Sequence, residues 1–115
     1  MAKDVLGGFE LQVLLAVMRL GDDAYGVPIA DAIEEASGRE INPGSIYITL
    51  DRLEDKGFVT SRLTDPTPER GGRAKRCYQL EALGERALQE SAVTAKRIWD
   101  VASKVWGKGW AKEHA

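Results

Sequence analysis

The sequence predicts a mainly α-helical fold that contains one two-stranded β-hairpin, and three observations support this class. Up to residue 57, apolar side chains recur at intervals of three and four residues between glycine-marked breaks, as expected of amphipathic helices. Two short runs of β-prone residues follow, separated by eleven residues that contain two prolines and two glycines. This pattern is typical of a hairpin with a long loop. Beyond residue 81 the helical interval returns.

The first two helices are predicted from their apolar faces and from the glycines that follow them. The first covers residues 9–20, and its apolar face is formed by Phe9, Val13, Leu14, Val17 and Met18. Gly21 is its expected C-cap. The second covers residues 25–37, admits Pro28 only because it falls in the first turn, and ends before Gly38. Its inward-facing residues are expected to be Ile29, Ala32, Ile33 and Ala36.

The third helix, at residues 43–56, has the clearest boundaries. Asn42 supplies an N-cap oxygen, Pro43 suits the first helical position, and Gly57 suits a left-handed residue after the last turn. On a helical wheel two stripes of side chains lie about 100° or more apart. The stripe expected in the core contains Ile46, Leu50 and Leu53, and the stripe expected at the surface contains Ser45, Thr49, Arg52 and Lys56.

The rest of the chain is predicted to form the hairpin and the last helix. Residues 58–63 and 75–80 are the expected strands, and residues 82–106 are the expected helix. Gly84 stands in the first turn of this helix, where glycine costs about 1 kcal/mol relative to alanine. We expect a folded N-terminal domain at residues 1–80, followed by a C-terminal helix and its tail at residues 81–115.

Positive charge is concentrated in one part of the chain, although the net charge of the 115 residues is −2. Residues 1–38 carry two bases and seven acids, so their net charge is −5. Residues 39–80 carry eight bases and six acids, which gives +2, and residues 81–115 carry +1. The run at residues 69–76 has four bases and one acid. The overall charge therefore does not exclude a nucleic-acid partner, because binding needs only a local basic surface.

Several functions are disfavoured by what the sequence lacks. It has no apolar run near the roughly 20 residues of a membrane span, so we expect a cytoplasmic protein with no membrane partner. Its one histidine, His114, stands in the C-terminal tail, and its one cysteine, Cys77, stands in a predicted strand. With no metal-ligand cluster and no glycine-rich phosphate loop, we expect no catalytic site, no metal and no cofactor. Cys77 is either a buried apolar residue, the simpler interpretation, or a redox sensor.

Three short helices followed by a hairpin form the plan of a winged helix-turn-helix domain, in which the third helix enters the DNA major groove. Short polar or bidentate side chains suit base edges. Those expected to contact bases are Ser45, Thr49 and Arg52. The side chains expected to contact phosphates are Lys56, Arg70, Arg73, Lys75 and Arg76.

Three stretches of the sequence carry a resemblance to a known family. They are AYGVPI at residues 24–29, GSIYITLDRLEDKG at residues 44–57 and GGRAKRCYQL at residues 71–80. In them the chain resembles the PadR family of bacterial transcriptional regulators, in its short type with a single C-terminal helix. The resemblance implies a homodimer that represses a promoter and leaves its DNA when a small molecule binds. It also implies that the Tyr47 hydroxyl contacts a DNA phosphate.

Alternative interpretations remain open for several of these residues. The ring of Tyr47 also suits packing beneath the hairpin. Arg52 suits either DNA or an ion pair with Glu54 or Asp55 on its own helix. Tyr25, at the start of the second helix, either contacts DNA or anchors that helix to the core. The basic run of the hairpin either binds phosphates or is an ordinary solvated loop.

The last helix is too long for its own domain to cover. Its residues, 82–106, extend about 37 Å, and Trp99 and Trp106 share one face because they are seven residues apart. We expect this face and the first helix to form a two-fold dimer, which sets two recognition helices about 34 Å apart on a palindromic operator. Alanines beside the tryptophans leave a slot for a small aromatic effector. The residues expected at this dimer and effector surface are Phe9, Val13, Ala92, Ala95, Ile98, Trp99, Ala102 and Trp106.

The sequence thus predicts a PadR-like, DNA-binding regulator. A second hypothesis is a winged-helix module that binds a ligand or another protein and does not read DNA. The acidic first segment favours the second hypothesis, and the basic run in the hairpin favours the first.

Overall fold

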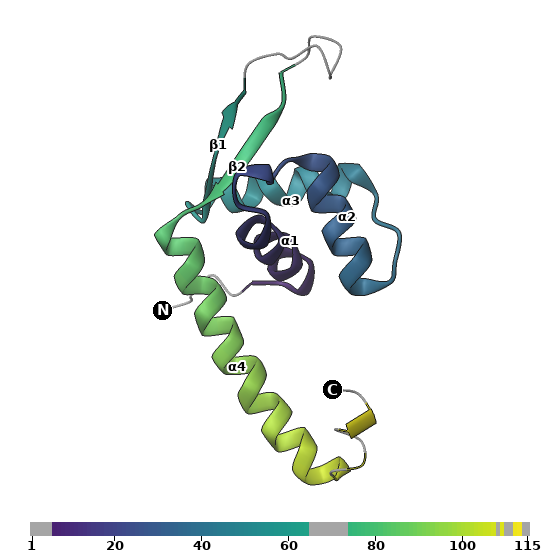
Figure 1. Cartoon of the computed structure of the whole chain (residues 1–115). Coiled ribbons are helices and arrows are strands. Elements are labelled where there is room, and N and C mark those ends of the chain that lie inside the picture. The colour runs from purple at the N-terminus through teal and green to yellow at the C-terminus, as the bar shows by residue number, and fades with distance from the viewer. Residues whose placement is uncertain (1–5, 65–73, 108, 110–111, 114–115) are drawn as a thin grey trace.

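The computed structural model describes residues 6–64, 74–107, 109 and 112–113. Its elements follow in the order α1 (Gly8–Leu20), the 3-10 turn η1 (Gly21–Asp23), α2 (Gly26–Ser37), α3 (Pro43–Asp55), β1 (Val59–Leu63), β2 (Arg76–Leu80) and α4 (Ala82–Trp106) (Figure 1). The predicted fold class, mainly helical with one hairpin, is confirmed.

The core lies where α1, α2 and α3 pack together against the base of the hairpin. Helix α1 is central because it contacts α2, α3, β2 and α4. All three residues predicted for the core of α3 are at most 1% exposed. Two predicted inward positions are wrong. Met18 is 44% exposed because it borders a groove between α1 and α4, and Ala36 is exposed at the edge of a shallow hollow between α1 and α2.

The boundaries of α3 arise from the residues that the sequence singled out. Asn42 Oδ1 accepts a hydrogen bond from the Gly44 amide at 2.8 Å, and Pro43 is the first helical residue. Gly57 has a φ of 79°, in the left-handed region that other residues rarely adopt. The predicted caps of α3 are therefore confirmed.

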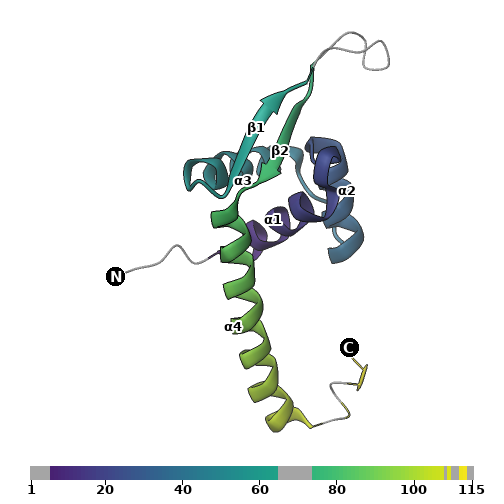
Figure 2. The same ribbon diagram turned by 60° about the vertical axis from the view of Figure 1, so that its left-hand side comes forward.

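The hairpin is antiparallel, with Val59 opposite Leu80 at its base. The base is fixed to the helices because the Tyr78 amide donates a hydrogen bond to the Ala24 carbonyl at 2.8 Å. The loop end of the hairpin projects away from the helices (Figure 2). This arrangement places Arg76, the first residue of β2, beside the helical domain rather than inside it.

Helix α4 begins in the core and then leaves it. Leu88 is 7% exposed and packs in the core, whereas every residue from 92 to 101 is exposed. The helix projects from the domain in both views (Figures 1 and 2), and the molecule measures 55 × 35 × 21 Å. In the part of the chain that the structure describes, no helix is both long enough and apolar enough to cross a membrane.

Candidate nucleic-acid interface

The surface of α3 that faces away from the core is centred on Ile48, which is 57% exposed. Ser45 and Arg52, three residues before and four residues after it, are also exposed on neighbouring parts of the helix. Thr49 is only 5% exposed. The prediction that Thr49 lies on the surface stripe is wrong, because it stands about 40° around the helix from the buried Leu53. Sequence reasoning overlooked Ile48, which the same wheel places opposite the core stripe.

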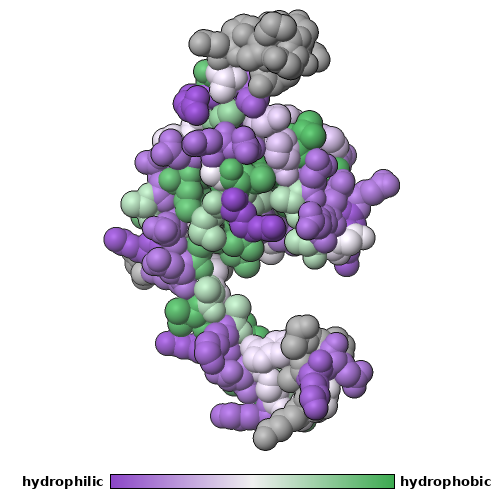
Figure 3. Space-filling view, in the orientation of Figure 1, coloured by the Kyte–Doolittle hydropathy of each residue, from purple (hydrophilic) through white to green (hydrophobic). Residues whose placement is uncertain are grey.

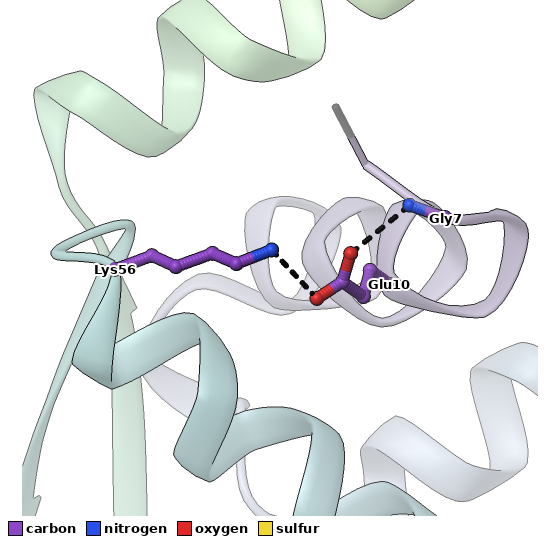
Figure 4. A network of polar contacts seen from close by, with 3 residues as sticks. All are labelled: Gly7, Glu10 and Lys56. Carbon is purple, nitrogen blue, oxygen red and sulfur yellow. Dashed lines mark hydrogen bonds and ion pairs between the residues drawn. The ribbon is translucent and has the colours of Figure 1, made fainter. Parts of the chain in front are cut away.

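Lys56, predicted to contact a phosphate, is paired within the domain. Its Nζ lies 3.0 Å from Oε2 of Glu10 in α1, and the other carboxylate oxygen accepts a hydrogen bond from the Gly7 amide at 3.0 Å (Figure 4). Burial raises the pKa of Glu10, but the Gly7 amide, Lys56 and Arg52 outweigh it, so this pKa lies below its ordinary value. The Lys56 charge is thereby balanced. Sequence reasoning missed the pair because its members are 46 residues apart.

A series of hydrogen bonds joins the hairpin to α3. Arg76 Nη1 donates to Ser61 Oγ at 2.9 Å, and that hydroxyl donates to Oε2 of Glu54 at 2.8 Å. Arg76 nevertheless stays exposed beside the loop. Arg52, among the described residues, forms no ion pair with Glu54 or Asp55. The alternative interpretation, an ion pair between Arg52 and an acidic residue of its own helix, is therefore not supported.

Tyr25 and Lys75 contact each other where the hairpin meets α2. Lys75 Nζ lies 3.8 Å from the centroid of the Tyr25 ring, which is a cation–π distance. Tyr25 also forms a β-bridge with Cys77 and is half-buried. These contacts favour an anchoring role for Tyr25 and hold Lys75 near the base of the loop. Cys77 is a buried free cysteine, in agreement with the simpler interpretation.

Tyr47 extends from α3 to the start of α2. A Cβ built on Gly26 would overlap the Tyr47 hydroxyl, so the two residues are in direct contact, while Tyr47 remains 48% exposed. Tyr78 is buried in the hairpin. Burial raises the pKa of Tyr78 and the charge of Arg76 opposes this only in part, so its hydroxyl stays neutral.

Two predicted phosphate contacts cannot be placed. Arg70 and Arg73 belong to the hairpin loop and lie outside the described residues. Within the described ranges, no group of three or more histidine, cysteine, aspartate or glutamate residues is arranged to hold a metal ion.

A second candidate surface lies between α1 and α4. It contains a groove of about 350 Å³, whose apolar lining includes Leu11, Leu15, Met18, Leu88, Ala92 and Ala95. Figure 3 shows hydrophobic residues gathered in the middle of the winged domain and continuing onto α4. Val13 was predicted at this surface, and that prediction is wrong: it is fully buried because it faces the domain's own core. Phe9 is partly buried against the same core.

Exposed apolar residues continue along α4 over a wider arc than predicted. Ile98, Trp99 and Trp106 are 64%, 38% and 56% exposed. Val101 and Val105, which were not among the residues predicted for the dimer surface, are 62% and 76% exposed. The apolar arc of α4 is formed by Ala92, Ala95, Ile98, Trp99, Val101, Ala102, Val105 and Trp106. It covers about half of the helix circumference.

An exposed third helix beside a hairpin that carries Lys75 and Arg76 defines this chain as a winged helix-turn-helix protein. A family model described as the PadR-like family of transcriptional regulators matches residues 14–90. The chain belongs to this family, and the resemblance noted in its sequence is confirmed.

Solved structures agree with this assignment. A PadR family transcription regulator from Clostridium difficile aligns with a TM-score of 0.74 and 25% identity, over 88% of this chain and 100% of that one. A PadR-like transcriptional regulator from Bacillus cereus aligns with a TM-score of 0.71, over 85% of this chain and 90% of that one. At 16% identity, the second comparison shows the fold alone.

A sequence relative is known from a mobile element. It is an uncharacterized 37.1 kDa protein in transposon Tn4556 of Streptomyces fradiae, 32% identical over 89 residues. The match covers 77% of this chain but only 24% of that protein, so this chain spans about a quarter of its relative's length.

Proposed function

We propose that this PadR-like regulator is a homodimeric repressor that binds a palindromic operator and is released from it by a small aromatic effector. The observation that carries the proposal is the exposed face of α3, with Ser45 and Arg52, beside a hairpin that holds Lys75 and Arg76 at its loop end. A recognition helix next to a basic wing suits a major groove and its flanking phosphates.

The proposed DNA contacts are of two kinds. Ser45 and Arg52 contact base edges, and Arg52 has the bidentate geometry that suits guanine O6 and N7. The proposed phosphate contacts are Tyr47, Arg70, Arg73, Lys75 and Arg76. Tyr25 is left out, because its contacts with Lys75 and Cys77 favour the anchoring role. Thr49 and Lys56 are left out, because the first is buried and the second is paired with Glu10.

Dimerisation through α4 and α1 is the second part of the proposal. The apolar arc of α4 continues into the groove beside α1, and burial of apolar surface is favourable by about 25 cal/mol per Å². We propose that residues 1–80 bind DNA and that residues 81–115 dimerise, with Leu88 packing in the core they share. Two copies of α3 would then enter successive major grooves about 34 Å apart.

The groove between α1 and α4 is the proposed effector site. Its volume of about 350 Å³ lies at the small end of the range for ligand pockets, and its lining is mostly apolar. These properties suit a small aromatic compound. Because the groove borders the proposed dimer seam, a ligand that prefers one spacing of the two DNA-binding units shifts the protein toward that spacing.

A salt titration of duplex binding tests the DNA-binding proposal. If a dimer neutralises about 6–10 phosphates, log K should fall against log salt concentration with a slope of roughly −5 to −9. Arg76→Ala should weaken binding to all sequences alike and reduce the slope by about 2 per dimer. Arg52→Ala should also relax the base preference at one position in each half-site.

Arg97→Ala is the matched control, because Arg97 is exposed on the polar side of α4, away from α3 and the hairpin. It should leave both the slope and the base preference unchanged. Affinity that does not depend on salt would contradict the proposal. Parent-like binding by both Arg52→Ala and Arg76→Ala would show that DNA contacts another face.

A winged-helix module that does not read DNA is the second candidate. The observation that favours it is the pair of exposed carboxylates, Asp51 and Asp55, on the outer side of α3, because like charges oppose an approach to phosphates. A mobility-shift assay with the gene's own upstream region distinguishes the two candidates. A folded dimer that shifts no duplex at low salt would favour the module.

A further inference from the structure

Ile48 is an exposed aliphatic side chain on a helix whose other aliphatic residues are buried. It is 57% exposed, whereas Ile46, Leu50 and Leu53 are at most 1% exposed. It is also absent from the hydrophobic core of the domain. Single exposed aliphatic residues are common on protein surfaces, so exposure alone does not give Ile48 a role. Its position on α3 and its neighbours do.

Two exposed neighbours of Ile48 on α3 are charged, one an acceptor and one a donor of hydrogen bonds. Asp51 is an exposed acceptor three residues later, and Arg52 is an exposed donor four residues later. The major groove presents groups that match all three: acceptors on guanine, a donor on the cytosine amino group and a methyl group on thymine. Thymine C5-methyl is the apolar group among them, and isoleucine offers no hydrogen bond to the others.

Ile48 is also placed early enough in α3 to reach base edges. It is the sixth residue of the helix, and the N-terminal part of a recognition helix contacts bases. The Asn42 cap and Pro43 order the turn that precedes it. The side chain is therefore presented from a regular helix rather than from a loop.

We propose that Ile48 is a specificity-determining residue that packs against the C5-methyl group of thymine at one symmetric position in each half-site. The proposal rests on the proposed function, because it requires α3 to lie in the major groove. It adds a preference for thymine beside the base that Arg52 contacts.

Replacing thymine by deoxyuridine tests this inference, because the exchange removes the methyl group and leaves the base-pairing edge intact. An operator is first selected from a random duplex pool with the parent protein, and each thymine is then replaced in both half-sites together. At one symmetric position we expect the parent's affinity to fall about four-fold per half-site, or about fifteen-fold for the dimer. Parent affinity that is unchanged at every thymine would overturn the inference.

Ile48→Ala shows whether Ile48 makes that contact. The variant should bind the thymine operator about as weakly as the parent binds its uracil form, and the same thymine-to-uracil exchange should leave its affinity unchanged. Because Ile48 is exposed, the Ile48→Ala variant should unfold at the same temperature as the parent. Val93→Ala, which removes an exposed aliphatic side chain from α4, should keep the full response to uracil.

The experiment separates the two levels of the proposal. If the parent shows no salt-dependent binding to any duplex, both the DNA-binding function and the role of Ile48 are overturned. If the parent binds DNA in a salt-dependent and sequence-specific way, but the thymine-to-uracil exchange weakens the binding of Ile48→Ala as much as that of the parent, only the role of Ile48 is overturned.

Discussion

At the scale of single residues, Gly84 determines how the hairpin and α4 join. It is buried in the first turn of α4, and a Cβ built on it would overlap the carbonyl oxygen of Phe58. That carbonyl accepts a hydrogen bond from the Glu81 amide at 2.9 Å, so it cannot move without disturbing the start of the helix. Helix propensity disfavours glycine here by about 1 kcal/mol, and the close approach of the backbone explains why glycine is present.

Gly84→Ala should destabilise the domain even though alanine is the better helix former. We expect the free energy of unfolding to fall by about 1–3 kcal/mol, the usual cost of an extra methyl group in a packed site. Gly8→Ala is the matched control, because Gly8 also lies in the first turn of a helix and a Cβ there meets nothing within 4 Å. The free energy of unfolding of Gly8→Ala should stay the same or rise slightly. Urea unfolding at one protein concentration measures both, and a Gly84→Ala variant as stable as the parent contradicts the expectation.

Thr49 and Ile48 show which part of the candidate site could be predicted from the sequence. The helical wheel identified Ser45 and Arg52 as exposed, and both are. It did not show where the edge of the core falls. Because α3 packs against both α1 and α2, its covered arc is wider than its aliphatic residues indicate, and Thr49 lies inside it.

At the scale of elements, the Glu10–Lys56 pair joins the first turn of α1 to the C-cap of α3. The two side chains are only 15% and 25% exposed, so water screens this pair less than an ordinary surface ion pair. Glu10 also accepts the Gly7 amide, as the third residue of a helix does when it caps its own N-terminus. One carboxylate thus stabilises a helix end and a contact between helices.

Glu10→Gln should lower the stability of the domain at pH 7 by about 1 kcal/mol. The pKa of Glu10 in the folded state lies below its ordinary value of 4.5. The stabilisation is therefore fully present above about pH 4.5 and is lost as the pH falls through the lowered value. The stability difference between parent and variant should be constant from pH 7 to about pH 5 and should shrink below that.

The matched control for this prediction is Asp100→Asn on α4. It breaks an ion pair with Lys96 whose side chains are 52% and 75% exposed, so it should change stability little at any pH. Denaturant unfolding at pH 7, 5, 4 and 3 measures all three proteins. If the parent and Glu10→Gln differ by the same amount at pH 3 as at pH 7, the carboxylate is not the source of the effect.

The elements themselves could be predicted because local signals determine where they begin and end. Asn42 begins α3, and Gly38 and Gly57, with φ of 72° and 79°, end α2 and α3. Helix α4 spans the predicted residues 82–106. Contacts such as that of Glu10 with Lys56 join segments far apart in the sequence, and no local pattern predicts which charges meet.

At the scale of the whole molecule, the winged domain and the projecting helix α4 present surfaces of different chemistry. The winged domain carries exposed charged and polar groups on α3 and the hairpin, whereas α4 carries the apolar arc. The length of α4 could be predicted, but the width of the arc could not. The predicted surface ended at Ile98 on one side, and Val101 lies about 60° beyond Ile98 around the helix.

Ile98→Asp should convert the proposed dimer into a monomer. Two-fold symmetry places both copies of the substitution in one seam, and burying an unpaired carboxylate in an apolar contact costs several kcal/mol. Val93→Asp is the matched control, because Val93 is a β-branched residue of α4 that is 52% exposed and lies outside the apolar arc. Sedimentation equilibrium should give the parent and Val93→Asp twice the 12.6 kDa chain mass, and Ile98→Asp the chain mass itself. Because one monomer contacts only one half-site, Ile98→Asp should also lose most of its operator affinity. An Ile98→Asp variant that stays dimeric would place the dimer seam elsewhere.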